Sequence, residues 1–173
     1  MKYLGNLLYI PACWLIFAIV SCMAAPAGQA QKMVLPVDVL RTGSQCLPAP
    51  ESWTATWISS SVQLRQMISR CNANRIGIVP KEEPAVDFER FGVLAVEMGQ
   101  QSSAGYGFEA EKITAYLEAH SAIVKLDWRR PSPGALTAQM VTGPWILIRM
   151  PVGLYNNIRV VDNDGRLLAQ INL

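Results

Sequence analysis

The chain offers few residues that could do chemistry, and His120 is its single histidine. His120 lies in the sequence EAHSA between two alternating segments, so we expect an exposed turn residue. A histidine base needs a nucleophile and a group that orients the ring, and neither can be assigned from this sequence. The sequence also lacks GxSxG, HExxH and a glycine-rich phosphate loop. We therefore expect a protein that is not an enzyme and needs no cofactor.

The sequence DNDG, residues 162–165, is the nearest approach to a metal-binding motif. A calcium loop needs acidic residues at its first, third and fifth positions and a later glutamate that binds the ion with both oxygens. That glutamate is missing here, whereas Asn-Asp and Asp-Gly suit the tight turn of a hairpin. We expect a turn at this position and no metal site.

Four cysteines are present, and two of them, Cys13 and Cys22, lie in or beside an apolar leader. The remaining pair, Cys46 and Cys71, is predicted to form a disulfide in an oxidising compartment. The bond would close a loop of about 25 residues and raise the free energy of unfolding by a few kcal/mol. Without a CxxC motif or a second ligand cluster, a redox or zinc role is not expected.

The leader has the parts of a secretory signal: Lys2, an apolar run over residues 4–20 and a small-residue exit. Ordinary cleavage fits the sequences APA and GQA, and we place the signal peptide at residues 1–27. The sequence IVSC equally fits the exit of a bacterial lipoprotein, which would leave Cys22 to carry lipid. An uncut membrane anchor is the third alternative, because the run approaches the length that spans a bilayer.

The rest of the chain has the size of one domain, which we place at residues 31–173. The whole chain holds 15 basic and 13 acidic residues, and they form neither a basic stripe nor an acidic tail. This balance argues against a nucleic-acid partner.

The sequence predicts one convincing helix after a proline-rich connection. Ser60 or Ser61 can cap it, and the asparagines at residues 72–74 can end it. The predicted apolar face consists of Val62, Leu64, Met67 and Ile68.

Short alternating runs predict strands over most of the remainder. These runs cover residues 32–43 with a break at Pro36, 91–98, parts of 106–120, 121–128, 135–141, 145–150 and the hairpin 157–171. The predicted class is α+β and mainly β, an antiparallel sheet or small sandwich with one packed helix.

A series of spaced motifs runs from VDF (residues 86–88) through an apolar strand that ends at Gly99. It continues with SSAGY (102–106), PSPG (131–134), Gln139 and TGPW (142–145). In this order and spacing, residues 86–151 resemble the C-terminal domain of the protease-complex subunit PrcB family. Two positions depart from the family pattern, because Ser102 replaces a proline and Ala104 replaces the first of two glycines.

The resemblance implies a secreted or lipid-anchored bacterial protein of the cell envelope or periplasm. Such a protein binds an exported protease, or another envelope protein, and helps it to mature or stay stable. One alternative is a structural envelope lipoprotein without a protease partner. The other is an inhibitor similar to the chagasin type of cysteine-protease inhibitor, whose three loops are faintly echoed by Gly105-Tyr106-x-Phe108, by Gly134 and by Pro144-Trp145.

We predict the binding surface in the turns of these motifs. Gly105 permits the sharp turn from which Tyr106 emerges as a rigid aromatic anchor, and the prolines stiffen the other loops. The predicted binding residues are Ser103, Gly105, Tyr106, Pro133, Gly134, Pro144 and Trp145. Purely structural roles compete with this interpretation, since Trp145 opens an apolar strand and suits a core. A clustered, exposed set of Tyr106, Pro133 and Pro144 would favour a protein partner, whereas burial of all three would indicate only a folded envelope domain.

Overall fold

The computed structural model describes residues 32–73 and 82–173. The predicted signal peptide, the possible lipid site Cys22 and the last asparagine expected at the helix end lie outside the described residues. Among the described residues, no helix has the length and apolar character needed to cross a membrane.

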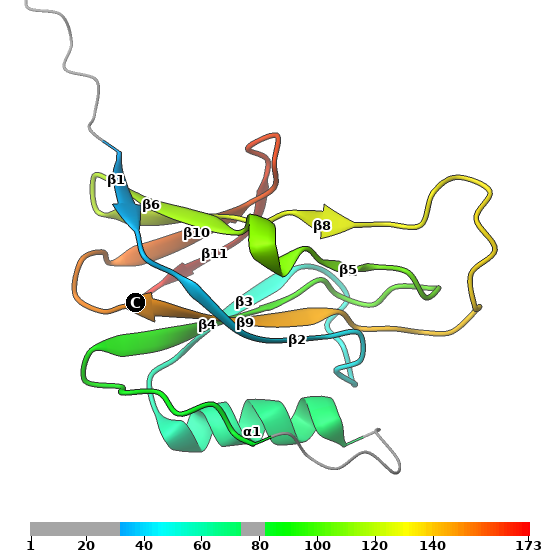
Figure 1. Ribbon diagram of the computed structural model, residues 1–173, viewed down its shortest axis with the longest axis horizontal. Coiled ribbons are helices and arrows are strands. Elements are labelled where there is room, and N and C mark those ends of the chain that lie inside the picture. Colours follow the sequence, from blue (N-terminus) through cyan, green and yellow to red (C-terminus); the bar gives the residue numbers. More distant parts are fainter. Residues whose placement is uncertain (1–31, 74–81) are drawn as a thin grey trace, which may run out of the picture.

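The described ranges form a mainly β fold with one α-helix, which confirms the predicted class (Figure 1). The first strands are β1 (Met33–Leu35), β2 (Asp38–Gly43), β3 (Thr54–Ile58) and β4 (Phe91–Glu97), with α1 (Ser61–Asn72) before β4. Then come β5 (Gly107–Phe108), the short 3-10 helix η1 (Ala110–Lys112), β6 (Thr114–Glu118), β7 (Ser121–Lys125) and β8 (Trp128–Arg129). The last strands are β9 (Trp145–Pro151), β10 (Asn157–Val161) and β11 (Leu167–Asn172).

The strands form two main sheets that pack as a small sandwich. One sheet has the order β1-β6-β7-β10-β11, the other has the order β2-β9-β4-β3, and β5 and β8 form a short ribbon. The main-sheet pairs are antiparallel except for β7 and β10, which run parallel. The sandwich is nearly closed, because β11 lies against β3 at one side and β1 leads directly into β2 at the other.

The central strands β4 and β9 bury both of their faces. Alternate residues point into the sandwich, where they join a core cluster: Leu94, Val96, Ile146, Ile148 and Met150. The residues between them join a second cluster beneath α1: Val93, Ala95, Trp145 and Leu147. The near-continuous apolar runs of these strands are explained by this double burial, since a half-exposed strand would alternate with polar residues.

Helix α1 covers the outer face of β4 and β9, as Figure 1 shows below the sheet. Its buried side chains are Leu64, Met67, Ile68 and Cys71. The prediction that Val62 belongs to the apolar face is wrong, because its side chain is 57% exposed. Val62 lies two positions from Leu64, and residues two apart point to opposite sides of a helix. The predicted disulfide between Cys46 and Cys71 is present and ties the last turn of α1 to the loop after β2.

The start of α1 is capped as the sequence predicted. The Ser60 Oγ atom accepts a hydrogen bond from the Gln63 backbone N–H at 3.3 Å, and the Gln63 Oε1 atom accepts one from the Ser59 N–H at 2.9 Å. The first bond satisfies a backbone donor in the first turn of the helix, and the second satisfies the N–H of the residue just before the cap.

We therefore expect Ser60→Ala to lower the free energy of unfolding by about 1 kcal/mol, because the N–H of Gln63 loses its acceptor. Chemical denaturation of the variant and the parent protein measures the difference. Ser60→Asn is the control, since asparagine also accepts this bond and should keep most of the stability. An equal loss in both variants would show that the cap is not the cause.

Candidate binding surface

The structure brings the motif loops together at one end of the sandwich. The loop of residues 99–106 follows β4, and the loop of residues 130–144 joins β8 to β9. Gln101 and Thr142 exchange both of their backbone hydrogen bonds, at 2.8 and 2.9 Å. Figure 1 shows the two loops, which we call the paired loops, at its right-hand side. Segments about 40 residues apart in the sequence thus form one continuous surface.

Further contacts join the two loops nearer their tips. The Ala104 N–H donates to the Ala138 carbonyl at 3.0 Å, and the Thr142 hydroxyl donates to the Ser103 carbonyl at 3.2 Å. Several backbone groups of this region are therefore paired across the two loops, and the loops support one another although neither belongs to one of the main sheets.

Gly105 has the positive φ that the sequence predicted, +103°. A Cβ atom at this position would lie 3.0 Å from Pro131 Cγ and 3.5 Å from Thr137 Cγ2. Any other residue would therefore strain the backbone and press against the opposite loop. Gly105 shapes the surface by letting the two loops approach closely.

The predicted binding residues separate into two groups. Pro133 and Gly134 are exposed, Gly105 lies at the exposed turn, and Ser103 and Tyr106 are half-buried. These residues lie on the paired loops, within reach of a partner. The remaining two, Pro144 and Trp145, are described next.

The prediction that Pro144 and Trp145 are surface contacts is wrong. Both residues are buried, and the Trp145 side chain is only 1% exposed. Trp145 belongs to the cluster beneath α1 and covers Gly43 of β2, where an added Cβ would come within 2.4 Å of its Nε1 atom. These two residues were the ones that resemble the third loop of the chagasin type of inhibitor. Because both are buried, neither side chain can contact a protease. Joint exposure of Tyr106, Pro133 and Pro144 was the feature that would favour a protein partner. Pro133 is exposed, Tyr106 is half-buried and Pro144 is buried.

The most exposed apolar side chains of the paired loops were missed by the sequence analysis. Leu136 is fully exposed, and Met140 and Val141 are 40% and 46% exposed. The predicted strand at residues 135–141 does not form, because no strand within residues 32–73 and 82–173 pairs with it. Local bonds replace the pairing, for example the Ala135 N–H with the Ser132 carbonyl at 3.0 Å. The turn residues PSPG and TGP on both sides were the available signal for a loop.

The remaining candidates for chemistry lie apart from this surface. His120 is exposed in the turn between β6 and β7, where the sequence placed it, and its carbonyl accepts a bond from the Asn156 N–H. The DNDG sequence forms the turn between β10 and β11, also as predicted. In the part of the chain that the structure describes, no three His, Cys, Asp or Glu side chains gather as a group that could hold a metal ion.

The residues before β4 have structural roles. The Asp87 Oδ1 atom accepts the Glu89 N–H at 3.1 Å and closes a turn, and Phe88 packs against the cluster beneath α1. The VDF motif therefore anchors the chain below the helix and takes no part in the paired loops.

The described fold is that of a β-sandwich domain that offers a loop surface. Residues 93–151 match the family model described as PrcB C-terminal, which confirms the resemblance over this segment. The match begins in β4, ends with β9 and includes both paired loops. It links the segment to the subunits of a protease complex. Curated proteins and solved structures gave no match to the chain.

Proposed function

We propose that this chain is a non-enzymatic accessory protein that binds an exported protease and helps it to mature or remain stable. The observation that carries the proposal is the family match over residues 93–151, which spans both paired loops. The two loops are the part of that segment that leaves the sandwich and is free to meet a partner.

The paired loops have physical properties that suit an interface. Leu136 is fully exposed, and the apolar side chains of Pro133, Met140 and Val141 accompany it. An exposed apolar group gains free energy when a partner covers it. The bonds at the base of the loops, between Gln101 and Thr142, reduce the conformational freedom that binding would remove.

The proposed location is the bacterial cell envelope, either the periplasm or the membrane surface through a lipid on Cys22. The leader sequence supports export, and the disulfide between Cys46 and Cys71 is typical of an oxidising compartment.

Affinity capture from envelope extract tests the proposal with matched variants of the tagged protein. We expect the wild type to retain a protease that mass spectrometry identifies, and Leu136→Ser to reduce its recovery about tenfold or more, since covering an exposed Leu side chain contributes about 1.5 kcal/mol or more. Val62→Ser is the control, because Val62 is also an exposed apolar residue but lies on α1, away from the paired loops. Both substitutions should leave the free energy of unfolding within about 0.5 kcal/mol of the wild type.

A second measurement links capture to function. In cells that lack the chain, the captured protease should be degraded faster, and the Leu136→Ser protein should restore its half-life less well than Val62→Ser. Recovery of wall or outer-membrane proteins alone, equal for both variants, would contradict the proposal. That result would favour a structural envelope protein.

A further inference from the structure

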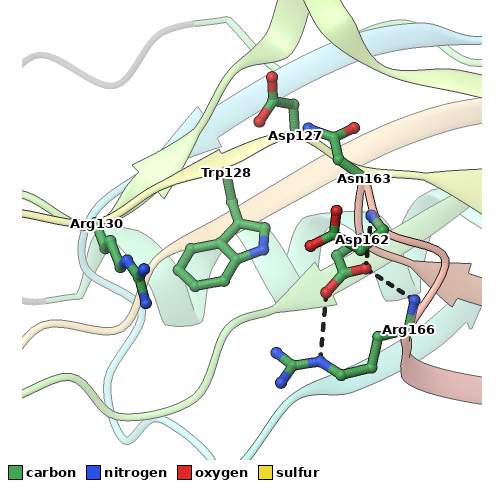
Figure 2. Close-up of a pocket in the computed structure, with 7 residues that line it drawn as sticks. Asp127, Trp128, Arg130, Asp162, Asn163 and Arg166 are labelled. Carbon is green, nitrogen blue, oxygen red and sulfur yellow. Dashed lines mark hydrogen bonds and ion pairs between the residues drawn. The ribbon is translucent and has the colours of Figure 1, made fainter.

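A hollow lies on the sandwich where β8 and Arg130, the first residue of the loop 130–144, meet the turn between β10 and β11. Its volume is about 400 Å³, within the range of small-molecule sites. Figure 2 shows Trp128 and Arg130 on one wall and the turn with Asp162, Asn163 and Arg166 on the other. The walls are joined at their base, since the Leu126 N–H donates to the Val161 carbonyl at 2.9 Å.

The turn that forms one wall is held in place from within. Asp162 is 8% exposed, and its Oδ1 atom accepts the backbone N–H groups of Asp164 and Arg166 at 3.0 and 2.8 Å. Its Oδ2 atom lies 3.3 Å from Arg166 Nε, so that the two charges compensate each other. The backbone of this wall is therefore held as a fixed turn, from which the side chains of Asn163 and Asp164 project.

The opposite wall presents a rigid aromatic surface. Trp128 is half-buried, and its ring packs edge-on against Trp53 with centroids 5.7 Å apart. Trp53 makes a similar contact with Phe108 at 5.9 Å. Figure 2 shows the indole of Trp128 between Arg130 and the pair of Asp162 and Arg166. The ring is thus fixed on one side and borders the hollow on the other.

The charges around the hollow are balanced. Asp127 is paired with Lys112 at 3.3 Å, and Asp162 is paired with Arg166. In the part of the chain that the structure describes, the side chains of Arg130, Asn163 and Asp164 make no hydrogen bond or ion pair. A ligand with a single charge of either sign would be attracted by one of the free charges, Arg130 and Asp164, and repelled by the other, whereas a neutral ligand with many donors and acceptors can bond to both.

We infer that this hollow binds a neutral sugar ring, as part of a short oligosaccharide or a glycan chain end. The C–H face of such a ring is apolar and packs on an indole, while its hydroxyls both donate and accept hydrogen bonds. Arg130 and Asn163 would donate to these hydroxyls, and Asp164 would accept from them. The inference does not depend on the proposed protease partner, because six of the seven lining residues lie outside the paired loops. The exception is Arg130, the first residue of the loop 130–144.

Nuclear magnetic resonance of the protein isolated from cells that express the full chain tests the inference. With nitrogen-15 in its tryptophans, the chain gives at most five indole N–H signals, and Trp128→Phe identifies the signal of Trp128. The probes are cellobiose and di-N-acetylchitobiose, with glucosamine and glucuronic acid as charged comparisons. We expect a neutral disaccharide to shift the Trp128 signal with a dissociation constant on the order of 1 mM and the charged sugars to bind more weakly.

Substitutions at the rim separate this site from non-specific effects. Arg130→Ala and Asp164→Ala should each weaken binding about threefold or more, the loss of one hydrogen bond. Arg159→Ala is the control, since Arg159 is an exposed arginine of β10 that does not line the hollow. A stronger response to di-N-acetylchitobiose than to cellobiose would indicate an amino-sugar glycan as the source, and the reverse order a neutral hexose polymer.

Any of three results would overturn the inference. The first is a Trp128 signal that does not move at about 50 mM of either neutral disaccharide, a concentration far above the expected dissociation constant. The second is tighter binding of one of the charged sugars than of both neutral ones. The third is binding of the neutral sugars by the Arg130→Ala and Asp164→Ala proteins that is as strong as binding by Arg159→Ala.

Discussion

Replacement of both Cys46 and Cys71 by alanine is expected to lower the free energy of unfolding by about 3 kcal/mol, because the closed loop then gains chain entropy in the unfolded state. The two cysteines are 25 residues apart, and both sulfur atoms are buried beneath α1. The bond therefore holds the end of the helix on the outer face of β4 and β9. A loss of this size is a large part of the stability of an ordinary domain.

Denaturation in urea measures this effect, with the wild type in the presence of a reducing agent as the second reference. The reduced wild type should unfold at nearly the same urea concentration as the variant with both cysteines replaced. A double variant as stable as the oxidised wild type would contradict the prediction. It would show that packing of Leu64, Met67 and Ile68 alone docks the helix.

Several elements could be predicted because their signals are local. The cap at Ser60, the apolar spacing of Leu64, Met67 and Ile68, and the DNDG turn each lie within a few residues of chain. The disulfide could be predicted from the number of cysteines and an oxidising compartment alone. These features depend little on what the rest of the chain does.

The wrong predictions concern features that depend on distant partners. Residues 135–141 have an alternating pattern, but a strand exists only where another strand accepts its hydrogen bonds. The sequence allowed Trp145 to lie either at the surface or in the core. Its burial depends on α1, which packs over Trp145 although the helix lies about 75 residues earlier in the sequence. A local motif cannot show which of its faces another element covers.

The hollow next to Trp128 could not be found in the sequence for a similar reason. Its walls come from residues 127–130 and 162–166, which meet because β7 and β10 pair in parallel. Parallel neighbours need a long connection, and nothing in a single sequence specifies which strands become neighbours in this way. The paired loops, in contrast, could be anticipated in part, because the family motifs contain both of them.

The second large effect is expected at the ion pair between Arg70 and Glu97, which joins the end of α1 to the end of β4. The Arg70 Nη2 atom lies 2.7 Å from Glu97 Oε1, and Glu97 is only 8% exposed. Arg70 also donates to the Pro48 carbonyl at 3.2 Å. Among the residues that the structure describes, the other carboxylate oxygen of Glu97 is buried without a partner, and so is the Nε1 atom of Trp145, which lies opposite Glu97 in the sheet. The carboxylate thus depends on one cation for its compensation.

Arg70→Met should lower the free energy of unfolding by about 3 kcal/mol, because it leaves a buried carboxylate with no opposite charge. The value lies at the low end for buried pairs, since the Arg70 side chain is one-third exposed and part of its interaction is screened. Glu97→Gln alone should cost less, about 1 kcal/mol, because the remaining arginine can turn towards water. Denaturant unfolding of both single variants and the double variant gives the coupling energy directly.

The double variant decides between the charge and simple loss of packing. If the unpaired charge is the cause, adding Glu97→Gln to Arg70→Met should recover at least about 1 kcal/mol. If the double variant is instead as unstable as the two single losses added together, the arginine acts through its contacts with Pro48 and Met67 rather than through Glu97. In the first case the pair fixes the helix end to β4, the strand from which the first of the paired loops departs, while the disulfide ties the same helix end to the loop after β2. Variants of this pair should then also weaken partner capture, although neither residue lies on the paired loops.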